Sequence, residues 1–283
     1  MPSLRRISCG TVRDTVERLF LEASTDLGKD VIGAIRKAAS VEKAELGRFA
    51  LERIIENARI AREECLPLCQ DTGMAVVFLE LGQNVHVTGS NLYDAVQEGV
   101  RRAYRKGHLR KSICDPLSRS NTGDNTPAVI HTEVIPGNRI GIKVMPKGGG
   151  SENMSSVNML LPAAGTDGIR QLIVNKVREA GPNPCPPTIV GVGIGGSIEK
   201  AALLAKKALL RPLGRRNRRD KRLAKLEADT LKEINMLGIG PQGYGGASTS
   251  LAVHVEMMPC HIASLPVAVN IQCHAARHKE AVI

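Results

Sequence analysis

The first 65 residues place apolar side chains three and four positions apart. This interval brings them to one face of a helix, with polar and charged residues on the other faces. The repeat runs through Val12, Val16, Leu19, Phe20, Val31, Ile32, Ile35, Leu46, Phe49, Ala50, Ile54 and Ile55. The pattern therefore predicts a layer of helices over residues 1–65.

Short apolar runs, some of them alternating with polar residues, replace this repeat after residue 65. Runs of this length are typical of strands. Four of them stand in two pairs, each joined by a turn-forming sequence, which predicts one hairpin from 74–81 and 85–87 and another from 128–134 and 139–145. Single strands are predicted at 188–193, 251–256 and 265–271.

Helical segments lie between these strands without the regular alternation of βαβ units. They are predicted at 91–106, 155–164, 167–179, 197–210 and 222–236, with Asn91 in position to cap the first. A polar, turn-rich loop covers 114–127, and such loops often carry functional residues. The sequence predicts an α+β fold with an N-terminal helical layer and mixed, largely antiparallel sheets, in a single domain over residues 1–283.

Composition excludes several classes of protein. With three Phe, three Tyr and no Trp, the chain has few aromatic platforms on which single-stranded nucleic acid could stack. No stretch approaches the roughly 20 apolar residues of a membrane span. The two arginines near the N-terminus are not followed by the apolar segment of a secretory signal. Seven cysteines without close spacing argue against a disulfide framework, so we expect a cytoplasmic protein.

The net charge of +11 is concentrated in one segment. Residues 211–222 carry seven basic side chains and one acidic one. Such a run is most often a solvated loop at the start of a helix. The alternative is a patch that binds nucleic acid or an acidic partner.

Three of the cysteines stand at turn-like positions beside Gly, Pro or polar residues. Their contexts are Cys69-Gln-Asp-Thr-Gly, Pro-Cys185-Pro-Pro and Gln-Cys273-His. None belongs to a Cys-x-x-Cys pair, which excludes the zinc-ribbon and thioredoxin patterns. Three thiolates brought together by the fold would suit an iron–sulfur cluster with one ligand fewer than the usual four, whose open iron is a Lewis acid. The alternative for each is a structural cysteine in a turn.

Two further segments could bind or activate a substrate. Asp71 follows Cys69 by two residues, where a carboxylate can orient water or a substrate hydroxyl. Gly149 is the middle glycine of Lys147-Gly-Gly-Gly, whose backbone N–H groups can form a nest for a carboxylate or phosphate. The alternatives are an ordinary Asp-Thr-Gly turn and a flexible glycine turn.

Arg110 and His261 are weaker candidates on sequence alone. Arg110 precedes the long polar loop, and arginine is suited to pair with a substrate carboxylate, although a surface arginine is as common. His261 lies twelve residues before Cys273, and a single histidine is more often structural than catalytic.

The segment Gly191-Val-Gly-Ile-Gly-Gly196 matches a dinucleotide-binding fingerprint in form. That fingerprint requires an acidic residue about 20 positions later, at the end of a second strand. The basic segment 211–222 occupies this place, so nucleotide binding is not predicted.

Taken together and in this order, these segments resemble the alpha subunit of the iron–sulfur hydro-lyases, class I fumarate hydratase and L-tartrate dehydratase. The likeness extends over essentially the whole chain. The matching stretches are 68–73, 119–123, 146–153, 185–187 with 191–196, and 261–266 through 270–273.

The resemblance implies a [4Fe-4S] cluster held by Cys69, Cys185 and Cys273, with its fourth iron binding a dicarboxylate substrate. It places Asp71 and His261 as catalytic residues. It places Gln70, Arg110 and Gly149 as substrate-binding residues. The implied reaction is reversible hydration of fumarate to malate, with dehydration of L-tartrate as the alternative. A different kind of alternative is a basic, non-enzymatic module that binds nucleic acid.

The resemblance also bears on partners. One-chain members of the family have a second domain that supplies further arginines, a lysine and a threonine base. This chain stops at Ile283, shortly after its last cysteine motif, which predicts a separate beta subunit that completes the site and an alpha chain inactive alone. Cys260, next to His261, could compete as third ligand; Cys273 is preferred because the family has Gln-Cys-His at the ligand.

Overall fold

The computed structural model describes residues 4–215, 217 and 220–283, and the chain divides into two compact units. Unit 1 consists of Met1–Gly28, Asn57–Gly149 and Arg277–Ile283, and unit 2 of Lys29–Glu56 and Gly150–Ala276. Three arginines of the basic segment, at positions 216, 218 and 219, lie outside the described residues. A single domain over the whole chain stays a prediction.

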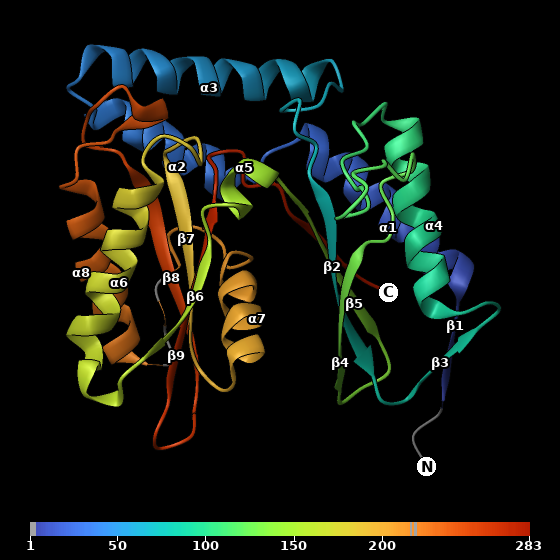
Figure 1. Ribbon diagram of the computed structural model, residues 1–283. Helices are drawn as coiled ribbons and strands as arrows, with labels where there is room; N and C mark the ends of the chain where they lie inside the picture. Colours follow the sequence, from blue (N-terminus) through green and yellow to red (C-terminus); the bar gives the residue numbers. More distant parts are fainter. Residues whose placement is uncertain (1–3, 216, 218–219) are drawn as a thin grey trace. The chain divides into compact units, whose positions relative to one another are not determined.

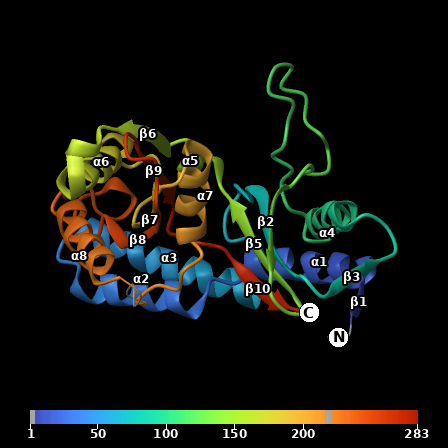
Figure 2. The ribbon, with the colours of Figure 1, turned by 90° about the horizontal axis from the view of Figure 1, so that it is seen from below.

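Unit 1 is built on a four-stranded mixed sheet. Its strands are β2 (Met74–Gly82), β4 (Val129–Ile135), β5 (Ile140–Lys147) and β10 (Lys279–Val282), in the order β10-β5-β2-β4 (Figures 1 and 2). Strand β2 is antiparallel to β5 and parallel to β4. A separate parallel pair is formed by β1 (Arg5–Ser8) and β3 (Val85–Thr88).

Helices α1 (Cys9–Thr25) and α4 (Leu92–Lys106) share the hydrophobic core of unit 1 with this sheet. Asn91 caps α4 as predicted, because its side chain accepts hydrogen bonds from Tyr93 N and Asp94 N. The two helices approach closely at Gly99, where an added Cβ would lie 2.6 Å from Arg13 O. Alternate β2 residues, Ala75, Val77 and Leu79, contribute to the same core.

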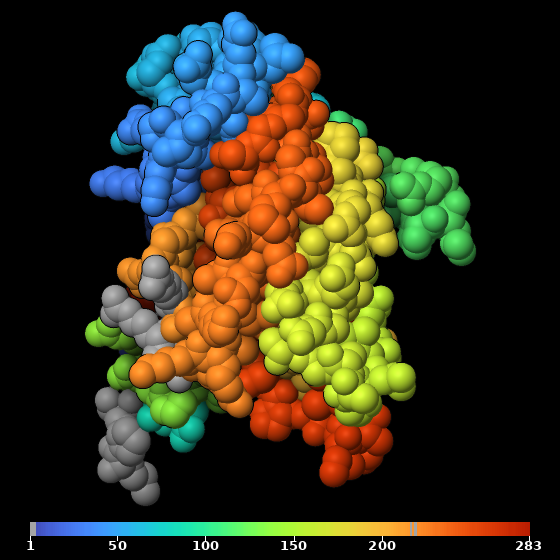
Figure 3. All heavy atoms as spheres, turned by 90° about the vertical axis from the view of Figure 1, so that its left-hand side faces the viewer, coloured from blue at the N-terminus to red at the C-terminus, as the bar shows by residue number. Residues whose placement is uncertain are grey.

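Unit 2 has a second mixed sheet with helices on both faces. Its strands are β6 (Ser156–Leu160), β7 (Thr188–Gly195), β8 (Ser250–Met258) and β9 (Leu265–Gln272), in the order β6-β9-β7-β8. Helices α6 (Gly165–Ala180) and α8 (Lys221–Asn235) lie side by side on one face, and α7 (Ile198–Ala208) covers the other (Figures 1 and 3).

The remaining elements are short or connect these layers. Helix α2 (Lys29–Val41) belongs to unit 2, and α3 (Glu45–Glu63) runs from unit 2 into unit 1. The one-turn helix α5 (Gly149–Glu152) follows β5, and two 3₁₀ turns span Pro162–Ala164 and Pro241–Gly243. None of the helices in the described ranges combines the length and apolar character needed to cross a bilayer.

The glycines of the fingerprint-like segment have a packing role. A Cβ on Gly191 would lie 2.2 Å from Ala205 O, and one on Gly193 would lie 2.0 Å from Ala201 O. Helix α7 therefore lies directly on the backbone of β7, which only glycine allows. This contact accounts for the glycine spacing without a nucleotide.

The mixed α+β class predicted from sequence is confirmed, but several local predictions are wrong. Neither predicted hairpin forms: β2 lies between β4 and β5, and β3 pairs with β1. The predicted helix at 155–164 is instead strand β6, antiparallel to β9, followed by a 3₁₀ turn. Strands β1 and β10 were not predicted.

A long loop between α4 and β4 extends away from the body of unit 1 (Figure 2). An isolated bridge joins Cys114 to Asn121 across it. Asp115 accepts hydrogen bonds from Leu117 N and Ser118 N, whereas the Leu117 side chain is 93 % exposed. The loop is thus a locally hydrogen-bonded arm with an exposed apolar tip.

Candidate functional site

Asp71 is held in a fixed position in unit 1 by two backbone donors. Its Oδ1 accepts from Gly73 N at 3.0 Å, and its Oδ2 accepts from Gly149 N at 2.7 Å. Gly73 has φ +78°, and a Cβ there would lie 2.7 Å from the backbone of Lys147. The residue must therefore be glycine, and the Cys-Gln-Asp-Thr-Gly turn is pressed against the end of β5. The structure brings the predicted residues Asp71 and Gly149 together.

Arg110 is connected to the same turn through its backbone. Thr72 Oγ1 donates to Arg110 O at 2.6 Å. Tyr104, fully buried, donates its hydroxyl to Thr72 O and Gly73 O at 2.9 Å each. Burial raises the pKa of Tyr104, so this hydroxyl remains a neutral donor. The Arg110 side chain itself is exposed.

Gln70 and Cys69 lie at the accessible side of the turn. Gln70 is exposed and Cys69 is half-buried. The Cys69 thiol donates to Gln70 Oε1 at 3.4 Å. Both side chains can therefore reach a ligand from the turn that holds Asp71.

Cys185 and Cys273 share one end of the sheet in unit 2. Ile189 pairs with Gln272, so the residues before β7 and after β9 meet there. His274 N donates to Cys185 O at 3.3 Å, and its ring Nδ1 lies 3.0 Å from the same oxygen. Cys185 has φ +54°, a left-handed conformation that a non-glycine residue adopts only when its surroundings hold it.

His261 and Cys260 lie at the opposite end of that sheet. His261 precedes β9, whereas Cys273 follows it, and the eight residues of β9 at about 3.3 Å each span roughly 26 Å. His261 is exposed, and its Nδ1 accepts from Ala263 N. Within one copy of unit 2, His261 does not share a site with Cys185 and Cys273. The same separation favours Cys273 over Cys260 as the ligand that accompanies Cys185.

The donor set fits an iron–sulfur cluster chemically. All seven cysteines lie in the described part of the chain, and none forms a disulfide. Cys69, Cys185 and Cys273 are each at least partly exposed. Cys69 belongs to unit 1 and the other two to unit 2. Among the described residues no group of three His, Cys, Asp or Glu side chains is arranged to hold a single metal ion.

One charged residue that sequence reasoning missed stands out in unit 1. Arg277 is 1 % exposed, and its Nε and Nη1 have no hydrogen-bond partner among the described residues. In the sequence it is one arginine among many, four positions after Cys273, with no motif around it. Only its burial distinguishes it.

The described part of the basic segment is engaged within unit 2. Arg211 pairs with the buried Glu227, and its Nη1 lies 3.7 Å from Glu256. Asp220 caps α8 and forms an ion pair with Arg222 at 2.6 Å. The predicted solvated loop falls partly on positions 216, 218 and 219, outside the described residues, and stays a prediction.

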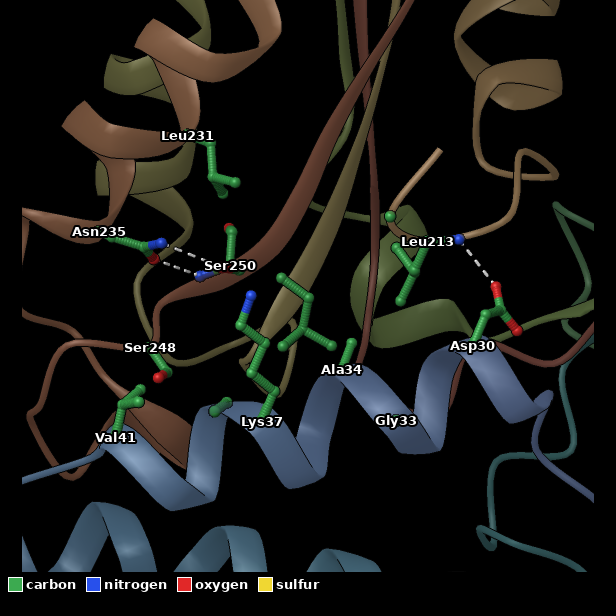
Figure 4. A pocket seen from close by; sticks show the side chains of 13 residues that line it. Asp30, Gly33, Ala34, Lys37, Val41, Leu213, Leu231, Asn235, Ser248 and Ser250 are labelled. Carbon is green, nitrogen blue, oxygen red and sulfur yellow. Dashed lines mark hydrogen bonds between the residues drawn. The ribbon is translucent and has the colours of Figure 1, made fainter. Parts of the chain in front are cut away.

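A pocket of about 440 Å³ lies next to this segment, between α2, α8 and the start of β8 (Figure 4). Leu213 N donates to Asp30 Oδ2, and the Asn235 side chain bonds the backbone of Ser250, so these polar groups are already paired. Lys37 extends into the pocket. None of the predicted site residues lines it.

Comparison with known proteins decides the family. The model of the family described as fumarate hydratase (Fumerase) matches residues 13–282. The chain belongs to this family. Membership makes it a hydro-lyase and removes the alternative of a non-enzymatic nucleic-acid-binding module.

Relatives within the fumarate hydratase family carry alpha-subunit names. A Methanocaldococcus jannaschii protein, provisionally named L(+)-tartrate dehydratase subunit alpha, is 44 % identical over 272 residues, covering 94 % of this chain and 95 % of that protein. The L(+)-tartrate dehydratase subunit alpha of Escherichia coli K12 is 33 % identical over 258 residues, covering 90 % and 84 %.

Proposed function

We propose that this chain is the alpha subunit of an iron–sulfur hydro-lyase that removes water from a 2-hydroxy dicarboxylate, with L-tartrate as its substrate. The observation that carries the proposal is the Asp71 carboxylate, held by Gly73 N and Gly149 N two residues after a half-buried cysteine. The names of the relatives at 44 % and 33 % identity favour tartrate. Reversible hydration of fumarate is the second candidate, favoured by the family's description.

Cys69, Cys185 and Cys273 are the proposed ligands of a [4Fe-4S] cluster. When bound, the cluster would supply a Lewis acid that polarises the substrate hydroxyl and carboxylate. The link between Cys185 O and His274 N supports two of the three ligands, because it holds the chain beside both thiols at one sheet end. For Cys69 the support is its place in the turn that carries Asp71.

Asp71 is the proposed proton-handling group. Both of its oxygens accept backbone N–H bonds, which fix the orientation of the side chain. An ionised carboxylate so held can accept a proton from, or orient, a substrate hydroxyl or water. Gln70, exposed beside Cys69, and the Arg110 guanidinium are the proposed donors to the substrate's own oxygens.

For Gly149 we propose a role other than direct binding of the substrate. Its N–H is used by Asp71 at 2.7 Å. We therefore propose that Gly149 orients the catalytic carboxylate and leaves space beside it. An added Cβ there would have Asp71 Oδ2, at 3.8 Å, as its nearest neighbour.

His261 enters the proposal only as a residue from a second copy of the chain. The length of β9 separates it from Cys273 within one copy. A His261→Ala variant that is inactive, but regains activity when mixed with an inactive Asp71→Asn variant, would support this arrangement. Full activity of His261→Ala would remove the residue from the catalytic set.

A separate beta subunit is the proposed partner. The relatives are named as alpha subunits, which implies for those proteins a further subunit. The test is co-expression with a candidate beta chain, anaerobic purification, and assay of water loss from L-tartrate and of fumarate hydration. Turnover of tartrate by the complex supports the proposal. Equal turnover by the alpha chain alone contradicts the need for a partner.

Asp71→Asn tests the catalytic assignment, with Asp115→Asn as matched control. Both aspartates accept a bond from the backbone N–H two residues later, but Asp115 lies on the exposed arm. We expect Asp71→Asn to lower kcat by about 100-fold or more, the usual contribution of a positioned acid or base. Asp115→Asn should retain wild-type kcat. Equal activity of the two variants would refute the role of Asp71.

A further inference from the structure

Arg277 lies at the edge of the Asp71 turn in unit 1. It precedes β10, whose Lys279 pairs with Val144 of β5, so Arg277 lies beside the end of β5 where the glycine run begins. A Cβ on Gly148 would be 3.1 Å from Asp71 Oδ2 and 3.7 Å from Arg277 Nη2. The side chains of Asp71 and Arg277 therefore both lie close to the Cα of Gly148. Arg277 lowers, and Asp71 raises, the pKa of the buried Tyr104, which agrees with this placement.

The guanidinium is buried, and among the described residues it forms no ion pair. Nε and Nη1 of Arg277 find no hydrogen-bond partner in the residues that the structure describes. A buried cation without pairing is strongly unfavourable, because it loses hydration without compensation. Arg211, a half-buried arginine whose Nε is also unbonded, differs because its Nη2 is paired with Glu227. In the described part of the chain, Arg211 therefore has a paired carboxylate and Arg277 does not.

Gly148 is buried and lies between these two groups. An added Cβ would be closer to Asp71 Oδ2 than ordinary contact allows and would touch Arg277 Nη2, so the absence of a side chain lets the two groups lie on the same side of the backbone. A small anion bound to Arg277 on this side would therefore lie beside Asp71. The planar guanidinium pairs best with a planar carboxylate.

We propose that Arg277 binds one carboxylate of the substrate and thereby brings the adjacent hydroxyl-bearing carbon to Asp71. The ligand class, a four-carbon dicarboxylate, rests on the proposed function. The assignment of Arg277 rests on the geometry of unit 1. It makes Arg277 a substrate-binding residue that is destabilising until the substrate is bound.

Equilibrium binding of succinate tests this proposal. Succinate has both carboxylates but neither a hydroxyl nor a double bond to react, so it reports binding alone. The anaerobic complex with the beta subunit is titrated calorimetrically as wild type, Arg277→Met and Arg277→Lys. We expect Arg277→Met to raise the Kd and the KM at least tenfold, with a smaller rise for Arg277→Lys. Gly148→Ala, which adds a Cβ beside both groups without changing charge, should also weaken binding.

Stability and cluster content distinguish binding from a structural role. Without substrate, Arg277→Met should unfold at a higher temperature than wild type, whereas Arg211→Met, which breaks a paired site, should unfold at a lower one. Iron content should be the same in Arg277→Met and wild type. Loss of iron in Arg277→Met would mean that the missing anion is the cluster, and would overturn the proposal.

Two further results would overturn it. In the first, the wild-type complex turns over tartrate, but Arg277→Met has the same succinate affinity and the same KM as wild type. The proposed function then stands, and the assignment of Arg277 fails. The other is absence of succinate binding to the wild-type complex. Conversely, if no hydro-lyase activity is found but Arg277→Met abolishes succinate binding, the proposed function fails and the assignment of Arg277 stands.

Discussion

The contact between β7 and α7 makes a quantitative prediction about one methyl group. In Gly193→Ala the new Cβ would lie 2.0 Å from Ala201 O, 2.6 Å from Ala205 N and 2.9 Å from Leu204 Cβ. Non-bonded carbon and oxygen atoms are normally at least about 3.3 Å apart, so α7 and β7 would have to separate by roughly 1 Å or more. Two of the three atoms are backbone, and no side-chain rotation can relieve the overlap.

The expected cost follows from this overlap. Overpacking a core typically costs about 1–3 kcal/mol, and a clash with backbone belongs at the upper end or beyond, so we expect a loss of about 3 kcal/mol or more. The matched control is Gly33→Ala in α2, where nothing lies within 4 Å of the added Cβ. There the same substitution should stabilise the helix by up to about 1 kcal/mol.

Urea unfolding followed by circular dichroism measures both variants, since the chain has no Trp for fluorescence. Hydrogen exchange in peptides from β7 and α7 localises the effect of Gly193→Ala. We expect the urea midpoint of Gly193→Ala to fall and that of Gly33→Ala to rise. The predicted clash would be refuted if the free energy of unfolding of Gly193→Ala lay within about 0.5 kcal/mol of the wild-type value, the range of ordinary surface substitutions. Such a result would reopen a ligand-binding role for the glycine segment.

Two buried titrating groups in unit 2 predict how stability depends on pH. Burial lowers the pKa of His254 to about 4, with a contribution from Arg211. Below pH 6.5, the ordinary pKa of histidine, the unfolded state therefore binds a proton at His254 that the folded state does not bind. The contribution of His254 to the free energy of unfolding should be fully present above pH 6.5 and should fall by about 2–3 kcal/mol towards pH 4. In urea unfolding, His254→Asn should reduce this dependence on pH. Burial opposes ionisation of Glu42, but hydrogen bonds from Ala247, Ala44 and Ser248 outweigh it and lower its pKa below 4.5. Its contribution should be present above pH 4.5 and lost below it. Glu42→Gln should destabilise by about 2 kcal/mol at pH 7 and by less at pH 3, and equal effects at both pH values would contradict this.

The sequence predicted the elements better than their pairing. Most helices and strands were found because their side-chain periodicity is local. The insertion of β2 between β4 and β5 depends on pairs such as Met74 with Lys147, which are far apart in the chain. The segment that forms β6 is short and half-exposed, so its apolar residues fit a helix as well as an edge strand.

The same limit applies to the candidate site. The motifs around Asp71 and Gly149 were recognisable, but only the register of β2 with β5 shows that they meet. His261 looked close to Cys273 because twelve residues separate them, yet those residues include a complete strand. Arg277 could not be found at all, because burial without a partner is a tertiary property.

We propose that Cys69, Cys185 and Cys273 together hold one iron–sulfur cluster. The most direct measurement is anaerobic reconstitution of the Cys→Ser variant at each of these positions and at Cys260, with iron content and visible absorbance recorded. Each of the three ligand variants should lose most of the iron and the brown colour, whereas Cys260→Ser should retain both. Retention of the full cluster by Cys69→Ser, Cys185→Ser or Cys273→Ser, or its loss in Cys260→Ser, would contradict the account.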